Sequence, residues 1–228
     1  MKVMFVEAKS KLQDIELDRA IVALAKYEKI SLISTVQFLH LIPKVQKILE
    51  KADKKVFVGK PSLHAVKEGQ VLGCDATSAN NVPEEIDAVL YMGTGRFHPL
   101  GAAYKFNTPV IRLDPFSGET EIISEKDVRR WQLKQQARIL KAKEAKVYGI
   151  LVTLKLGQNE MQGKAFEIKK KLEQQDKQAY IFISDTINSQ ELRNFPKIEC
   201  WISTACPRMV DDQDLYNKPI VNVEELAL

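Results

Sequence analysis

Short runs of apolar residues recur along the chain, separated by more polar segments. The runs have the length of buried strands and are rich in β-branched side chains. We expect strands at Val3–Val6, Ile30–Ser34, Lys55–Val58, Ile86–Met92, Val110–Leu113, Tyr148–Val152, Ala179–Ile183, Cys200–Ser203 and Ile220–Val223. The turn sequence Asp114–Gly118 also predicts that Thr120–Ile123 forms a hairpin with the strand before it.

Several segments between the strands carry apolar residues at the spacing of an amphipathic helix. These buried stripes are Leu17, Ile21 and Leu24; Leu41, Val45 and Ile48; and Met161, Ala165, Ile168 and Leu172. Strand and helix therefore alternate. This alternation predicts an α/β fold with mostly parallel sheets and right-handed crossovers.

A long polar segment in the middle of the chain divides this pattern in two. Ser124 followed by Asp127 resembles a capping box, and the helix that it would start runs to about Lys146. We therefore expect two consecutive α/β domains and a connecting helix, at residues 1–123, 147–228 and 124–146 respectively.

The two halves share a short pattern. Ile86–Ile111 and Ile198–Val221 each contain a strand, a loop with proline, and a second strand that follows another proline. A duplicated unit would place equivalent loops around one shared site. Duplication and a coincidence of short patterns explain this similarity equally well.

The composition narrows the class of protein. The chain has 228 residues, 45% hydrophobic and 28% charged, with 34 Lys and Arg against 30 Asp and Glu. These values exclude a disordered or collagen-like chain, and the net charge of +4 does not indicate a nucleic-acid partner. The start has no signal-peptide core, and the longest apolar run is too short to cross a bilayer. Three cysteines make no disulfide framework, so we expect a cytoplasmic protein with no membrane association.

Four loops follow predicted strands, where ligands of α/β proteins bind. They are residues 69–75, 93–101, 153–158 and 203–208. In the second loop, Gly93 and Gly95 precede a helix expected to begin near Pro99, so backbone N–H groups could hold an anion. A plain tight turn explains these glycines as well. His98 and Lys155 lie in such loops and could bind a ligand, or remain a packing residue and a solvated charge.

Two of the cysteines also lie in these loops. Cys74 is either a small buried residue or a metal ligand, since Asp75 beside it disfavours a free thiolate unless a metal is bound. Cys206 precedes Pro207, a pattern known in cluster-binding loops. Cys200 is expected to lie in the core of a strand. No single stretch has the spacing of a zinc site, so a metal site would need ligands from separate units.

Taken together, the loop motifs resemble one family. In order, they are Gly73-Cys74-Asp75, Gly95-Arg96-Phe97-His98-Pro99-Leu100-Gly101, Leu113-Asp114-Pro115-Phe116-Ser117-Gly118, Lys155-x-Gly157-Gln158 and Thr204-Ala205-Cys206-Pro207-Arg208. This set resembles the archaeal diphthamide synthases, the 2-(3-amino-3-carboxypropyl)histidine synthase family. The similarity runs from about Gly69 to the C-terminus, and more faintly over Ser34–Gln37.

The resemblance implies three homologous α/β domains that each give one Cys to a [4Fe–4S] cluster, whose open iron binds S-adenosylmethionine. The 3-amino-3-carboxypropyl fragment is joined to C2 of a histidine imidazole on translation elongation factor 2, without a side-chain acid or base. Members of this kind are dimers. By this resemblance Cys74 and Cys206 are cluster ligands of the second and third domains. The residues that position S-adenosylmethionine would be Gly93, Gly95, His98, Lys155 and Gln158.

The chain departs from the family in one respect, because the first domain and its Cys have no counterpart. The missing domain could be a separate polypeptide, a partner subunit could complete the site, the sequence could be a fragment, or the chain could be a paralogue without activity. The expected assembly is a homodimer, as the resemblance implies, or a complex with a protein that supplies the N-terminal domain. Two rival functions also remain: a non-catalytic accessory subunit, or a nucleotide-binding protein that uses Gly93 and Gly95.

Overall fold

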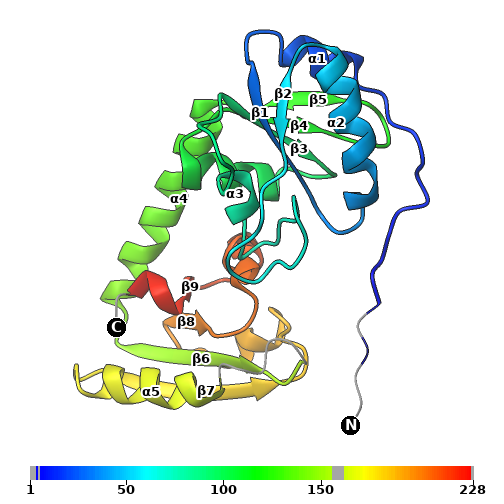
Figure 1. Ribbon diagram of the computed structural model, residues 1–228. Coiled ribbons are helices and arrows are strands. Elements are labelled where there is room, and N and C mark those ends of the chain that lie inside the picture. The colour runs from blue at the N-terminus through cyan, green and yellow to red at the C-terminus, as the bar shows by residue number, and fades with distance from the viewer. Residues whose placement is uncertain (1–3, 5, 156–161, 227–228) are drawn as a thin grey trace. The chain divides into compact units, whose positions relative to one another are not determined.

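The computed structural model describes residue 4 and residues 6–155 and 162–226, and its chain divides into two compact units (Figure 1). The first unit is Met1–Arg130 and the second is Trp131–Leu228. Helix α4 (Glu125–Glu144) carries residues of both units.

The first unit is built on a five-stranded sheet of order β2-β1-β3-β4-β5. Its strands are β1 (Lys29–Ser34), β2 (Lys55–Phe57), β3 (Ala88–Met92), β4 (Val110–Leu113) and β5 (Thr120–Ile122). The first four are parallel, and β5 pairs antiparallel with β4, which confirms the predicted hairpin. The helices are α1 (Asp18–Ala23), α2 (Ile42–Lys51) and α3 (Phe97–Phe106), with short 3-10 turns at Leu39–Leu41 and Thr77–Ala79.

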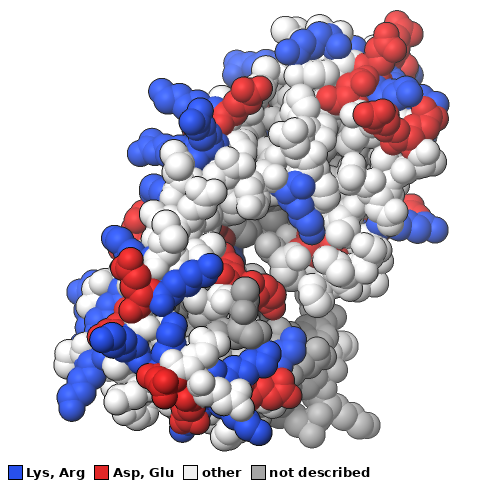
Figure 2. Space-filling view, turned by 90° about the vertical axis from the view of Figure 1, so that its left-hand side faces the viewer, with Lys and Arg blue, Asp and Glu red and all other residues white. Residues whose placement is uncertain are grey.

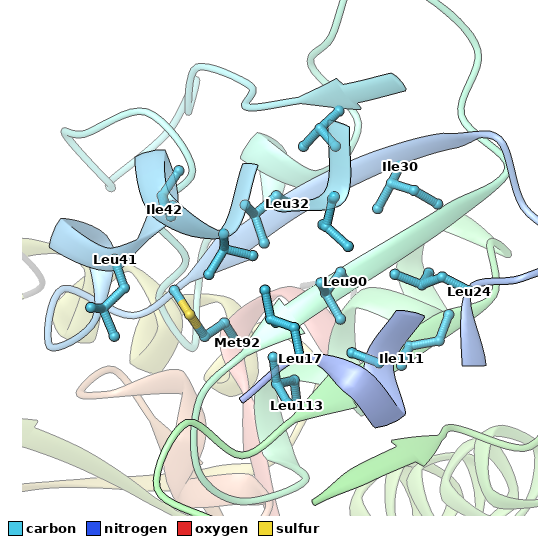
Figure 3. Packing of buried hydrophobic residues seen from close by; sticks show 14 of the residues in the cluster. Leu17, Leu24, Ile30, Leu32, Leu41, Ile42, Leu90, Met92, Ile111 and Leu113 are labelled. Carbon is cyan, nitrogen blue, oxygen red and sulfur yellow. The ribbon is translucent and has the colours of Figure 1, made fainter. Parts of the chain in front are cut away.

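Both faces of this sheet are buried, as parallel sheets require. Figure 3 shows the face on which Leu32, Leu90 and Ile111 pack against α1 and α2. Tyr91 and Val110 point to the other face and pack in the cluster that contains α3. Because neighbouring residues of a strand face opposite sides, strands buried on both sides have continuous apolar runs.

The second unit has a four-stranded sheet of order β7-β6-β8-β9, with every pair parallel. Its strands are β6 (Val147–Thr153), β7 (Gln178–Ser184), β8 (Cys200–Ser203) and β9 (Ile220–Asn222). Helix α5 (Gln162–Glu173) connects β6 to β7. The short 3-10 helices are η4 (Glu191–Asn194), η5 (Pro207–Val210), η6 (Gln213–Leu215) and η7 (Val223–Leu226).

The two sheets share one strand order. Numbered along the chain within each unit, the strands lie in the order 2-1-3-4 across both sheets. The first unit adds β5 beside its fourth strand. This common topology supports the duplication that the sequence pattern indicated. In both units the chain leaves the first and third strands toward opposite edges, so a crevice is expected at the C-terminal ends of these neighbours.

One predicted strand is wrong. Met4 and Val6, from the expected strand Val3–Val6, lie outside the sheet with exposed fractions of 83% and 79%, and Val3 and Phe5 lie outside the described residues. This apolar run is long enough for a strand, but no described strand lies beside it to pair with. The other predicted strands are present with ends that differ by at most two residues, and α3 begins at Phe97 rather than near Pro99.

The helical stripes are confirmed where the structure describes them. Ala165, Ile168 and Leu172 are buried on α5, whereas Met161 lies outside the described residues. Basic and acidic side chains are intermixed over the face shown in Figure 2. Across the described part of the chain, no helix is long and apolar enough to span a membrane.

Candidate functional site

The loop that carries Cys74 is anchored at the C-terminal end of β1. Gln70 forms a parallel bridge with Ser34, the last residue of β1, and the Ser34 hydroxyl donates to the Met92 carbonyl at 2.7 Å. Cys74 follows a few residues later and is exposed. The backbone pairing therefore places the Cys74 loop at the C-terminal edge of the first sheet, the edge at which ligands of α/β proteins generally bind.

Asp75 braces this loop from inside. Its buried carboxylate accepts hydrogen bonds from the backbone N–H groups of His64, Ala65 and Thr77 at 2.8–2.9 Å, and from the Thr77 hydroxyl at 2.6 Å. Burial alone would raise the pKa of Asp75, but these hydrogen bonds outweigh it and lower the pKa to about 2. The carboxylate therefore holds the loop together from inside, in addition to placing a negative charge next to Cys74 in the sequence.

The glycine loop follows β3, on the other side of the first crevice. Gly95 has a φ of +75°, which favours glycine, and the space around it is open. The Gly93 N–H donates to the Leu113 carbonyl at 2.9 Å, so it is not available to bind an anion. A side chain at Gly93 would collide with the Tyr91 phenol, whose oxygen lies 2.5 Å from an added Cβ.

His98 lies in the first turn of α3, stacked on this phenol. The ring centroids of Tyr91 and His98 are 5.8 Å apart with an interplanar angle of 21°, and the Tyr91 oxygen lies 3.4 Å from His98 Nδ1. Burial raises the pKa of Tyr91 to about 12, so the phenol stays protonated. Gly93, Tyr91 and His98 therefore form one packed group.

A hollow of about 460 Å³ lies at the C-terminal ends of β6, β7 and β8 in the second unit. Lys155, after β6, and Cys206, after β8, both line it. Its other lining residues are Thr153, Asp185, Thr186, Ile187, Asn188, Ser189, Ala205, Met209, Asp212, Leu215 and Tyr216. Strands β6 and β8 are the pair between which the strand order reverses, where α/β sheets bind ligands.

Hydrogen bonds fix both ends of this hollow. The Thr204 hydroxyl donates to the Leu151 carbonyl at 2.9 Å, and Cys206 then precedes η5 with its carbonyl accepting from the Met209 N–H at 3.0 Å. The Lys155 N–H donates to the Thr153 hydroxyl at 3.2 Å. The two strand ends therefore hold the backbone beside a half-buried thiol and an exposed ammonium.

The three cysteines lie in different environments, and none of them forms a disulfide. Cys200 is fully buried within β8, and burial raises the pKa of its thiol to about 12, which confirms its prediction as a core residue. Cys74 and Cys206 are accessible from solvent. In the described residues, no group of three or more His, Cys, Asp and Glu side chains could hold a metal ion.

The structure thus brings together some of the predicted residues. Lys155 shares a hollow with Cys206, while Gly93, Gly95 and His98 form one loop of the first unit with Cys74 at the same sheet edge. Gln158 lies outside the described residues. Sequence reasoning missed Tyr91 and Asp185; only the position of each at or near the C-terminal end of a strand could have indicated them.

Fold and sites together define a class: an α/β protein of two similar units with accessible thiols at the C-terminal ends of parallel strands. The chain belongs to the diphthamide synthesis family, because the family model described as "Putative diphthamide synthesis protein" matches residues 1–228.

Individual relatives agree with this assignment. The chain is 32% identical over 201 residues to a 2-(3-amino-3-carboxypropyl)histidine synthase of Pyrococcus horikoshii, covering 88% of this chain and 56% of the relative. A protein of the same name from Methanocaldococcus jannaschii is 36% identical over 162 residues, which cover 69% and 45% of the two chains. The chain therefore spans about half the length of these curated relatives.

A solved structure is also similar. Dph2 from Pyrococcus horikoshii, determined with a 4Fe–4S cluster, matches with a TM-score of 0.80 at 30% identity. The match covers 92% of this chain and 59% of that one. This similarity confirms the mixed α/β fold with mostly parallel sheets.

Proposed function

We propose that this chain forms part of an enzyme that transfers the 3-amino-3-carboxypropyl group of S-adenosylmethionine to a histidine of translation elongation factor 2. The observation that carries the proposal is the hollow of the second unit, which both Cys206 and Lys155 line and which lies where the strand order reverses. A chain of this family with a thiol and a cation in such a place has the groups to hold an iron centre and a carboxylate.

The thiols fit part of the ligand set of a [4Fe–4S] cluster. Cys74 and Cys206 are accessible to solvent and lie in loops at the C-terminal ends of strands, whereas Cys200 is fully buried in the core. They would hold the cluster as thiolates, with a third Cys from the first domain of the family. When bound, the reduced cluster would supply the electron that cleaves the carbon–sulfur bond of S-adenosylmethionine.

The remaining residues would bind and orient the methionine portion of S-adenosylmethionine. The Lys155 ammonium would pair with its carboxylate, which is a charge-assisted interaction. Gly95 leaves open space in the loop that leads to His98. Gly93 would contribute by leaving room for Tyr91, because its N–H already donates to the Leu113 carbonyl and is not available to the ligand. A role for Gln158 rests on the motif alone.

The proposed chemistry also defines the partners. The protein substrate is elongation factor 2, so the reaction belongs in the cytoplasm. The working assembly is a homodimer or a complex with the protein that supplies the N-terminal domain. Neither nucleic acid nor a membrane has a direct role.

Anaerobic reconstitution with iron and sulfide tests the proposal, on the chain alone and with a supplied first domain. We expect bound iron, visible absorbance and an electron paramagnetic signal after reduction, with the complete set requiring the first domain. Cys74→Ser and Cys206→Ser should each lower the iron content, whereas the matched control Cys200→Ala should bind iron as the native chain does.

Absence of a cluster under both conditions would contradict thiolate ligation. If the cluster forms but elongation factor is modified equally well by Cys74→Ala and Cys206→Ala, the accessory-subunit interpretation is correct instead. A rise in melting temperature with nucleotide and no iron would favour the nucleotide-binding interpretation.

A further inference from the structure

The two sheets end in edge strands of very different length. Strands β2, β5 and β9 have three residues each, whereas β7 has seven. The sequence of β7, QAYIFIS, contains no charge, proline or glycine. Long uncharged edges are templates for pairing with another strand, and proteins normally shorten, charge or cover them.

The outer edge of β7 presents backbone groups that no described strand uses. The Gln178 N–H donates to the Lys146 carbonyl, and the Ser184 carbonyl accepts from Leu154, so even-numbered residues face β6. Because backbone groups alternate along a strand, those of Ala179, Ile181 and Ile183 point outward. Figure 1 shows β7 at the border of its sheet.

Two large apolar or aromatic side chains of β7 are exposed to solvent. Tyr180 and Ile183 have exposed fractions of 51% and 59%. Tyr180 is on the same face as Phe182, whose ring packs edge-on against Phe195 and Trp201 with centroids 4.6 and 5.0 Å away. An aromatic group therefore extends to the edge of the sheet.

We propose that β7 pairs antiparallel with β7 of a second copy of this chain, about a two-fold axis at Ile181. The outward groups of Ala179 would then pair with those of the partner's Ile183, and Ile181 with its own copy. Tyr180 would lie opposite Phe182 in a close cross-strand pair, which adds an aromatic contact.

Charge at the strand ends selects this register. The residues that flank β7 are Lys177 and Asp185, and only pairing centred on Ile181 places them opposite each other. Pairing centred on Tyr180 would instead set Lys177 against the apolar Ile183. In the single chain the Lys177 ammonium donates to the Tyr148 hydroxyl of β6 and the Lys143 carbonyl of α4, so pairing with the partner's Asp185 would require this side chain to turn outward.

A second copy fits this edge because the segment is complementary to itself. A two-fold interface uses the same patch on both subunits, and the chain has one long edge strand among its described residues. Pairing therefore closes at two copies instead of growing into a fibre. This inference specifies the homodimer named above, and rests on that part of the proposed function but not on its chemistry.

Sedimentation velocity of the full chain tests the interface. We expect the native chain to be a dimer and Ile183→Pro to be a monomer, because proline removes the outward N–H while the hydrogen bonds to β6 are untouched. The matched control Ile183→Thr keeps that N–H and a β-branched side chain and should remain largely dimeric. A monomeric native chain, or a dimer of Ile183→Pro as tight as the native one, would overturn the proposal.

Disulfide formation checks the register without relying on that variant. Chains with Tyr180→Cys and chains with Phe182→Cys, mixed and oxidised, should form a crosslink between the two positions, because directly opposite residues lie within disulfide reach. Peptide mapping separates this bond from the native cysteines. Absence of the mixed crosslink, or equally fast crosslinking of Tyr180→Cys to itself, would overturn the register. Neither readout involves iron, so a failure here is distinct from a failure of the cluster proposal.

Discussion

At the scale of single residues, Asp75 shows how a charge next to a thiol can have a structural role. Its carboxylate takes hydrogen bonds from both sides of the loop, and those bonds lower its pKa to about 2 from an ordinary 3.8. A carboxyl whose pKa is lower in the folded state stabilises the fold when it is ionised. This stabilisation is complete above about pH 4 and is lost as the pH falls toward 2.

Asp75→Asn should therefore destabilise the Cys74 loop at neutral pH by about 2 kcal/mol, since one pKa unit corresponds to about 1.4 kcal/mol. Amide hydrogen exchange at His64 and Ala65 should accelerate by about thirty-fold at pH 7. The difference should shrink as the pH falls toward 2, because the native carboxyl is then protonated as well.

The control for this measurement is Glu68→Gln in the neighbouring segment. Glu68 is exposed and pairs with Lys60 at 3.5 Å, so its loss should change stability by less than about 0.5 kcal/mol. Equal exchange rates in Asp75→Asn and the native chain would show that the carboxylate does not brace the loop.

At the scale of elements, α4 begins as the sequence indicates. The Ser124 hydroxyl accepts from the Asp127 N–H at 3.1 Å and donates to the Asp127 carboxylate at 2.7 Å. Arg96 adds an ion pair to the same carboxylate at 2.8 Å. This cap fixes the first turn of a helix whose exposed sequence is too polar to be held by burial alone.

Ser124→Ala should lower the free energy of unfolding of the first unit by about 1 kcal/mol, the usual value of an N-cap. The measurement is chemical denaturation followed by circular dichroism. Ser124→Thr keeps the hydroxyl and should lose less than half as much. A Thr variant that is as unstable as the Ala variant would argue against capping.

The same scale shows what the sequence could predict. The buried strands were predictable because sheets covered on both faces make continuous apolar runs. The strand predicted at Val3–Val6 was wrong because an apolar run does not show whether a partner strand exists. The rule that ligands bind at the C-terminal ends of strands led to Lys155 and Cys206, which line one hollow. The stacking of Tyr91 on His98 depends on side-chain packing that no local pattern encodes.

At the scale of the whole molecule, the two units have separate cores. The clusters that contain Leu90 and Tyr91 draw only on the first unit, and those that contain Ile202 and Trp201 only on the second, among the described residues. A domain needs its own core to fold as a unit. We therefore expect two unfolding transitions instead of one.

The tryptophans make this separation measurable, because both Trp131 and Trp201 belong to the second unit. Leu90→Ala removes a fully buried side chain from the first core and should cost about 2–5 kcal/mol. The loss should appear in the circular dichroism transition and leave the fluorescence midpoint in place. Ile202→Ala, equally buried in the second core, should move the fluorescence midpoint. If Leu90→Ala moves both signals together, the units unfold as one cooperative body and the continuous helix α4 transmits stability between them.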